Sequence, residues 1–250
     1  MISSSLPSVT KAILLDIEGT TTPIAFVHEV LFSYARSHVA EFLTAHFGAE
    51  DVTADLALLR AEHAGDLKQG LMPPALATGT REAEINSLVA YVNWLIDQDR
   101  KSPGLKSLQG KIWKQGYVDG VLKSQVFADV APAFERWRRA GLQLSIFSSG
   151  SVLAQKLLFA HTEAGDLTSF IDSYFDTTVG SKTDVQSYRQ MTAALSLTAS
   201  QVLFISDVVN ELAAASDAGM QTLLCVRPGN QPQSLTDTYH MIHSFAEISG

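Results

Sequence analysis

Lys11-Ala12-Ile13-Leu14-Leu15-Asp16 is the stretch that decides the fold, because it is a short, unbroken apolar run that ends in a carboxylate. Similar short runs occur at Leu142–Phe147, Val202–Ile205 and Thr222–Val226. Continuous apolar runs of this length are typical of strands that are buried on both faces, as in a parallel sheet covered by helices. We therefore expect these four segments to be strands of an α/β domain.

Helical patterns separate the later apolar runs. They cover Ala131–Ala140, Val152–Ala160, Tyr188–Leu195 and Glu211–Ala218. A glycine follows the first and the last of these patterns, where a helix would end. Alternating strands and helices predict an open parallel sheet with right-handed crossover connections.

About a hundred residues after the first strand have a different pattern, in which apolar residues recur at helical spacing. The helical patterns are Phe26–Phe47, Ala54–His63, Glu82–Ile96 and Leu108–Val118, interrupted by Leu71-Met72-Pro73-Pro74 and Ser102-Pro103-Gly104. We interpret this segment as a helical subdomain inserted into the sheet domain. The predicted limits are residues 1–22 and 122–250 for the catalytic core and 23–121 for the inserted cap.

The composition excludes several classes of protein. The 250 residues are 46% hydrophobic and 18% charged, which excludes a disordered chain. The net charge of −8 argues against a general nucleic-acid binder, because such proteins need a positive surface for the phosphate backbone. The single cysteine, Cys225, excludes an intramolecular disulfide framework and a cysteine-rich zinc site.

The cellular location is predicted from the first ten residues and from the lengths of the apolar runs. Met1–Thr10 carries no side-chain cation and leads into no signal-type apolar region. The apolar runs are far shorter than the ~20 residues that span a bilayer. We expect a soluble cytoplasmic protein with no nucleic-acid and no membrane partner.

Polar residues follow the predicted strands. Asp16-Ile17-Glu18-Gly19-Thr20 comes after the first strand, and Ser148-Ser149 after the second. Lys182 precedes a helical pattern, and Ser206–Glu211 follows the third strand with acids at Asp207 and Glu211. The carboxyl ends of parallel strands form the ligand crevice of an open sheet, so these residues should gather there. Carboxylates placed so close repel one another, and a hard divalent cation such as Mg²⁺ would relieve that repulsion.

Each of these segments alone also has a structural interpretation. Asp16 can cap a helix, a serine after Phe147 can be an ordinary helix N-cap, and Lys182 can be a solvated surface lysine. Glu211 can be a favourable acid in the first turn of a helix. The four segments together, in the order acid-x-acid, Ser, Lys and acid-x-x-x-acid, are far more specific than any one of them.

In this order the motifs resemble those of the haloacid-dehalogenase-like phosphotransferase superfamily. Within it, the chain resembles the enolase-phosphatases, also called acireductone synthases, over nearly its whole length. The motifs that carry the resemblance are Asp16-Ile17-Glu18-Gly19-Thr20-Thr21, Ser148-Ser149-Gly150-Ser151, Gly180-Ser181-Lys182 and Ser206-Asp207-Val208-Val209-Asn210-Glu211. Glu18 stands where the wider superfamily has Asp, and enolase-phosphatases share that difference.

The resemblance implies a Rossmann-like core and a role for each motif residue. Asp16 would be the nucleophile that forms an aspartyl-phosphate, and Asp16, Glu18 and Asp207 would hold one Mg²⁺ per chain, supported by Glu211. The residues that would bind the phosphate are Ser148, Ser149 and Lys182, the last also pairing with Asp16. Glu18 would also be the acid–base group, but a carboxylate bound to Mg²⁺ is a poor proton carrier, so that assignment stays open.

The resemblance also implies a reaction. A small phosphorylated substrate, 2,3-diketo-5-methylthiopentyl-1-phosphate, would be enolised and then dephosphorylated to the acireductone in methionine salvage. Its methylthio tail needs an apolar pocket, for which Phe26 is a candidate. His28 is a candidate base for enolisation, although a structural histidine is the commoner interpretation. The family resemblance favours a monomer.

Two alternatives remain at this stage. The first is a phosphatase of the same superfamily that acts on another small phosphate monoester, while a halide-releasing dehalogenase would not require acids at Glu18 and Asp207. The second is a binding protein that keeps the fold without catalysis. A competent residue type at every position of the constellation argues against the second alternative.

Overall fold

The computed structural model describes residues 4–234 and 238–249. Its contacts divide the chain into two compact units, Met1–Val27 with Lys123–Gly250 and His28–Leu122. This division assigns residues 23–27 to the sheet-containing unit, whereas the predicted limits assign them to the insert.

The first unit contains a parallel six-stranded sheet in the order β4-β3-β2-β5-β6-β7. Its strands are β2 (Ala12–Leu15), β3 (Gln143–Phe147), β4 (Ser173–Phe175), β5 (Val202–Ser206), β6 (Gln221–Cys225) and β7 (Met241–Ile242). A separate two-stranded sheet pairs β1 (Ser4–Ser5) with β8 (Ile248–Ser249). The predicted open parallel α/β sheet is therefore confirmed.

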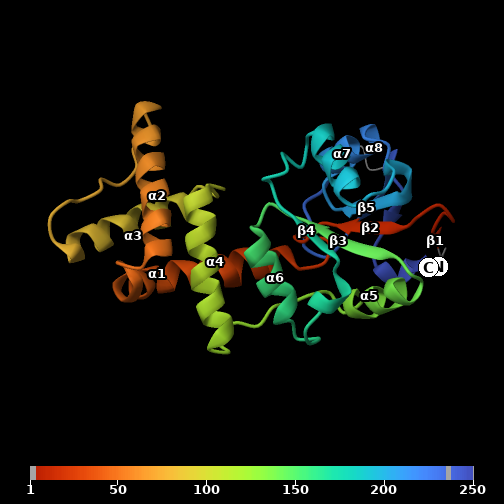
Figure 1. Ribbon diagram of the computed structural model, residues 1–250, viewed down its shortest axis with the longest axis horizontal. Coiled ribbons are helices and arrows are strands. Elements are labelled where there is room, and N and C mark those ends of the chain that lie inside the picture. Colours follow the sequence, from red (N-terminus) through yellow and green to blue (C-terminus); the bar gives the residue numbers. More distant parts are fainter. Residues whose placement is uncertain (1–3, 235–237, 250) are drawn as a thin grey trace. The chain divides into compact units, whose positions relative to one another are not determined.

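Helices cover both faces of this sheet, with α7 and α8 on one face and α5 and α6 on the other (Figure 1). They are α5 (Val130–Arg139), α6 (Val152–Ala160), α7 (Val185–Ala194) and α8 (Val209–Asp217). Short 3₁₀ turns lie at η2 (Thr168–Phe170), η3 (Ala199–Gln201) and η5 (Phe245–Glu247). Because both faces are covered, the central strands are apolar without alternation.

The apolar core explains why the central strands are so uniform in sequence. All four residues of β2 are fully buried. Ala12 and Leu14 pack in a cluster with residues from α7, α8 and the neighbouring strands, among them Tyr188, Phe204 and Leu212. Complete burial of each large apolar side chain contributes roughly 1.5–3 kcal/mol.

The register of the central strands sets the level at which they end. Leu15 lies opposite Ile146 of β3 and Ile205 of β5, and Ile205 lies opposite Leu223 of β6. The residues that follow these strands therefore leave the sheet at one edge. Asp16, Ser148 and Asp207 follow β2, β3 and β5 at this edge.

The second unit is helical. It contains most of the π-helix η1 (Phe26–Phe32), then α1 (Ser33–His46), α2 (Glu50–Lys68), α3 (Arg81–Asp97) and α4 (Pro103–Val118). The segment Ser102-Pro103-Gly104 separates two helices, as expected, but it is also the start of α4. The Ser102 hydroxyl accepts from the Leu105 N–H, and Pro103 takes the first turn, where its missing N–H costs nothing.

Buried polar contacts hold the second unit together. Asp66 is 1% exposed and accepts hydrogen bonds from Arg100 at 2.9 Å and from the Tyr91 hydroxyl at 2.7 Å. Burial and the Asp66 contact raise the pKa of Tyr91. None of the helices in the described ranges combines the length and apolar character that a membrane crossing requires.

Candidate active site

Asp16 and Lys182 meet at the carboxyl end of the sheet. Asp16 is 4% exposed, and its backbone N–H still donates to Ile205 of β5, so the first residue beyond β2 is fixed by the sheet. The Lys182 ammonium pairs with Asp16 Oδ1 and lies 2.7 Å from Glu211 Oε2. Burial alone would lower the pKa of Lys182, but the carboxylates of Asp16 and Glu211 outweigh it and raise the pKa.

The backbone around Lys182 is held by contacts that require particular residues. Gly180 has φ +129°, and a Cβ there would lie 2.3 Å from Ser187 Oγ, so only glycine fits. The Ser187 hydroxyl donates to the Ser181 carbonyl at 2.7 Å, and the buried Tyr188 hydroxyl donates to the Lys182 carbonyl at 2.7 Å. Helix α7 thus fixes the loop that carries the lysine.

Asp207 and Glu211 complete a group of three buried carboxylates, of which Asp16 and Glu211 pair with the Lys182 ammonium. The Ser206 hydroxyl donates to Glu211 Oε2 at 2.9 Å. Burial and the charges of Asp16 and Glu211 raise the pKa of Asp207 to about 7. Burial and Asp16 raise the pKa of Glu211 to about 7, against the opposing effect of Lys182. The site therefore carries more negative charge than its own lysine balances.

The donor set fits a hard divalent cation. Asp207 is 7% exposed, and its buried Oδ1 atom has no hydrogen-bond partner within the described residues. An unpartnered carboxylate oxygen beside two further acids is the kind of oxygen ligand that Mg²⁺ accepts. In the described part of the chain, no three His, Cys, Asp or Glu side chains form a ready-made metal cluster. Mg²⁺ usually keeps several waters and takes one or two carboxylates, so the residues present are compatible with it.

The predicted phosphate-binding serines lie just after the neighbouring strand, β3. Ser148 follows β3 and is 5% exposed, and its N–H donates to the Phe175 carbonyl at 3.2 Å. Its hydroxyl oxygen accepts from the Gly150 N–H at 3.1 Å, which leaves the hydroxyl proton for another acceptor. Ser149 is partly exposed in the same turn.

The remaining predicted residues follow β2 along the chain. Glu18 is partly exposed and forms a backbone bridge with Thr22. Phe26 is 2% exposed, and His28 is exposed with its ring edge-on to Phe32 at 5.1 Å. The structure thus brings Asp16, Lys182, Asp207 and Glu211 together.

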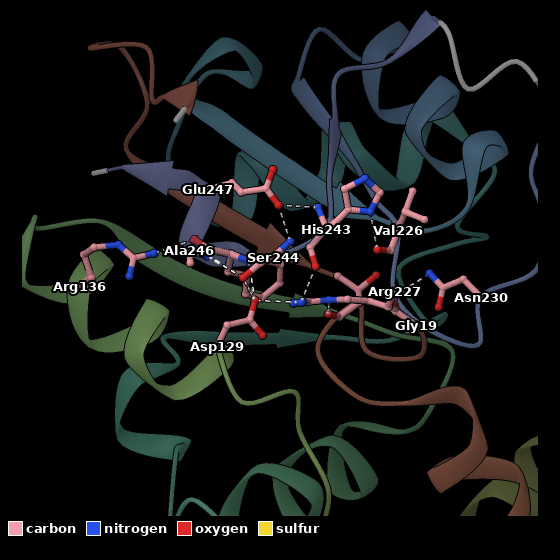
Figure 2. Close-up of polar contacts among 12 residues, drawn as sticks. Gly19, Asp129, Arg136, Val226, Arg227, Asn230, His243, Ser244, Ala246 and Glu247 are labelled. Carbon is pink, nitrogen blue, oxygen red and sulfur yellow. Dashed lines mark hydrogen bonds and ion pairs between the residues drawn. The ribbon is translucent and has the colours of Figure 1, made fainter. Parts of the chain in front are cut away.

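Two residues of the loop after β6 also contact the Asp16 loop, and no sequence motif marks them. Arg227 Nε donates to the Thr20 carbonyl at 3.1 Å, and Asn230 Nδ2 donates to the Gly19 carbonyl at 3.0 Å (Figure 2). Their partners on that loop are backbone carbonyls, which leave no trace in a residue pattern. Their position just after an apolar strand was the available signal.

Comparisons with known proteins agree with this geometry. Residues 10–219 match the family model of haloacid dehalogenase-like hydrolases. Enolase-phosphatase E1 of Synechococcus elongatus is 52% identical over 97% of this chain and 99% of its own length. The chain belongs to the enolase-phosphatase family. The predicted family resemblance is therefore confirmed.

Other enolase-phosphatase relatives extend the comparison. The probable bifunctional methylthioribulose-1-phosphate dehydratase/enolase-phosphatase E1 of Sorghum bicolor is 43% identical over 99% of this chain and 50% of its own length. The crystal structure of the UTR4 protein from Saccharomyces cerevisiae has a TM-score of 0.75 and 35% identity, covering 94% of this chain and 98% of the yeast chain. This enolase-phosphatase family member is thus similar to solved and curated proteins along almost its entire length.

Proposed function

We propose that the chain is a bifunctional, Mg²⁺-dependent enolase-phosphatase of methionine salvage. It would enolise 2,3-diketo-5-methylthiopentyl-1-phosphate and then hydrolyse the phosphate ester to give the acireductone. The observation that carries the proposal is the buried Asp16–Lys182–Glu211 contact, found in a chain that is 52% identical to an enolase-phosphatase over nearly its full length. The plant relative whose name joins this activity to a methylthioribulose-1-phosphate dehydratase supports the place in methionine salvage.

Asp16 is proposed as the nucleophile. Its carboxylate would attack phosphorus while the bond from phosphorus to the substrate oxygen breaks, which leaves an aspartyl-phosphate on Asp16. Water would then attack the same phosphorus, releasing phosphate and regenerating the carboxylate, and the proton that this water gives up balances the one that the departing substrate oxygen takes up. Covalent catalysis of this kind divides one difficult displacement into two easier ones.

Lys182 and the serines after β3 are proposed to bind the phosphate. The Lys182 ammonium lies against Asp16 Oδ1, so it would keep that carboxylate ionised and face the incoming phosphate oxygens. Ser148 keeps a free hydroxyl proton because its oxygen accepts from Gly150, and it would donate that proton to phosphate with Ser149 beside it.

Asp16, Glu18 and Asp207 are proposed as the residues that hold Mg²⁺, with Glu211 in support. When bound, the cation would supply positive charge to the phosphoryl oxygens and to the developing enolate. Glu211 accepts from Ser206 and Lys182, so its carboxylate is positioned before any cation arrives. Glu18 is assigned first to the cation, and its action as acid–base stays a separate proposal.

The setting of the enzyme is part of the proposal. Cys225 is buried and free, so nothing in the described chain depends on an oxidising environment. We propose that the enzyme acts as a monomer in the cytoplasm, with the helical insert as its cap and Phe26 near the methylthio tail.

The test uses the native chain with the diketone phosphate and Mg²⁺, following enol formation by absorbance and phosphate release separately. We expect enol to form first and phosphate to follow, with both steps lost after EDTA treatment and restored by Mg²⁺. A panel of sugar phosphates and other small monoesters is the control. Faster turnover of a panel member than of the diketone phosphate would support the wider phosphatase alternative and overturn this assignment.

A further inference from the structure

The side-chain amide of Asn230 joins the Asp16 loop to the end of a strand. Its Nδ2 donates to the Gly19 carbonyl at 3.0 Å (Figure 2). The same Nδ2 donates to the Cys225 carbonyl at 3.3 Å, where β6 ends. Only the NH₂ end of an amide can donate, so the two carbonyls fix its orientation. Gly19 has φ +74°, and a Cβ on it would lie 2.4 Å from Asp207 Oδ2. Asn230 therefore holds Gly19 in the position where its bare Cα packs against Asp207.

The side-chain amide of Gln155 makes the same kind of connection on the other side of the site. Gln155 is 1% exposed in α6, and its Nε2 donates to the carbonyls of Gly150 and Phe175, each at 2.8 Å. Phe175 ends β4, and its carbonyl also accepts from the Ser148 N–H. Gly150 donates its own N–H to the Ser148 hydroxyl. Gln155 therefore holds both residues that orient Ser148.

The two amides share one architecture. Each ties a glycine carbonyl in a site loop to the last carbonyl of a strand farther out in the sheet, β6 for Asn230 and β4 for Gln155. Within the described residues, the hydrogen bonds of both amides go to backbone carbonyls and not to the side chains proposed to react. They lie on opposite sides of β2 in the strand order, one beside Asp207 and the other beside Ser148.

We propose that Asn230 and Gln155 are paired positioning residues with separate tasks: Asn230 sets the geometry of the cation site, and Gln155 sets the geometry of the phosphate site. The inference rests on the proposed function for the identity of those two ligands. Residues that orient metal ligands without touching the metal typically change metal affinity 10- to 100-fold when mutated. A hydroxyl that loses its orientation loses a charge-assisted hydrogen bond to phosphate, which weakens binding about tenfold.

The experiment compares Asn230→Leu with Gln155→Met. Each substitution keeps the approximate shape of the side chain and removes the two hydrogen bonds that its amide donates. Two dissociation constants are measured by calorimetry: Mg²⁺ alone, and inorganic phosphate at saturating Mg²⁺. We expect Asn230→Leu to weaken Mg²⁺ binding by about 10-fold or more and to change phosphate binding by less than about threefold. Gln155→Met should weaken phosphate binding about tenfold and leave Mg²⁺ binding within about threefold.

The crossed pattern distinguishes a positioning role from a general loss of stability. Each variant loses two hydrogen bonds, so the melting temperature should fall by a similar amount in both. Equal effects of each variant on both constants, or no effect on either, would overturn the proposal. If a Leu or Met variant fails to fold, the uncharged variants Asn230→Ala and Gln155→Ala replace it and must give the same crossed pattern. A native chain that binds both ligands but hydrolyses no ester defeats the proposed function alone, while a native chain that binds neither defeats both proposals.

Discussion

Lys182 and Arg227 are two largely buried cations on loops at the same edge of the sheet, and they differ in the number of carboxylates that they contact. Lys182 pairs with both Asp16 and Glu211, and its side chain is 12% exposed. Arg227, 4% exposed, donates to one carboxylate, Asp129, at 2.8 Å and to the carbonyls of Thr20 and His243 at 3.1 and 3.0 Å (Figure 2). Its guanidinium also lies over the rings of Phe127 and Phe245, at 4.5 and 4.7 Å.

The pKa shifts show what this difference means. Burial would raise the pKa of Asp129, but hydrogen bonds from Arg227, Ser244 and the Phe245 N–H outweigh it and lower the pKa. Around Lys182 the acids outnumber the cation, and burial raises the pKa values of Asp207 and Glu211 to about 7. The Arg227 cluster is thus a balanced scaffold. The Lys182 cluster is kept in an unbalanced state, as functional sites often are.

The largest expected effect is on catalysis and comes from Asp16→Asn. An amide cannot attack phosphorus, so turnover should fall by about 10⁴-fold or more. The melting temperature should stay equal or rise, because one charge leaves a crowded site. Steady-state kinetics and thermal unfolding measure both quantities. Asp97→Asn, an exposed acid of the helical unit, is the control that should keep full activity. Persistent turnover by Asp16→Asn would refute the nucleophile assignment.

The next effect is on stability and comes from Arg227→Met. This change leaves the partly buried Asp129, whose side chain is 17% exposed, without its cation, which should lower the free energy of unfolding by about 3 kcal/mol. Urea denaturation provides the measurement. Arg139→Met removes a matched arginine whose pair with Glu135 is exposed, and it should cost less than about 1 kcal/mol. Similar losses from the two variants would show that burial of the Arg227 cluster adds nothing.

The smallest effect is a difference in pH dependence between the two clusters, measured without divalent cations. The pKa of Asp129 is lowered in the fold, so its stabilisation is present above its unfolded pKa of about 4 and is lost as the pH falls through the folded value. The pKa of Asp207 is raised to about 7, so the stability that it contributes declines as the pH rises from about 4 through 7.

Two variants test these opposite signs. Asp129→Asn should flatten the loss of stability at acid pH, and Asp207→Asn should flatten the decline toward neutral pH by about 1 kcal/mol or more. Urea midpoints between pH 3 and 8 measure both limbs. A single limb that responds to both variants would contradict the separation of the clusters.

The central strands could be predicted from the sequence, and so could the edge of the sheet at which Asp16, Ser148 and Asp207 lie. Both predictions depend on the burial of parallel strands between two layers of helices. The apolar runs before Asp16, Ser148 and Asp207 mark strands buried on two faces, and a parallel sheet brings their carboxyl ends to one edge. β4 and β7 escaped prediction because Ser173–Phe175 and Met241–Ile242 are too short to show a run. The roles of the predicted ligands remain predictions.

What the sequence could not show is the support around the site. Ser206 was visible as part of a motif, yet its hydrogen bond to Glu211 depends on how α8 begins. Arg227, Asn230 and Gln155 donate to backbone carbonyls, and several of these carbonyls lie in segments that are remote in the sequence. Such contacts depend on the folded path of two loops at once, which no local pattern of residue types encodes.

Cys225, whose carbonyl accepts a hydrogen bond from Asn230 at the end of β6, also allows the opening of this strand to be measured by thiol labelling. Cys225 is completely buried, and burial raises the pKa of its thiol to about 12, so the native protein should be inert to thiol reagents. Because this is the only cysteine in the chain, any labelling reports an opening of the end of β6. The labelling rate would therefore measure how often the end of β6 beneath the cation site opens, and no cysteine would have to be introduced into the enzyme.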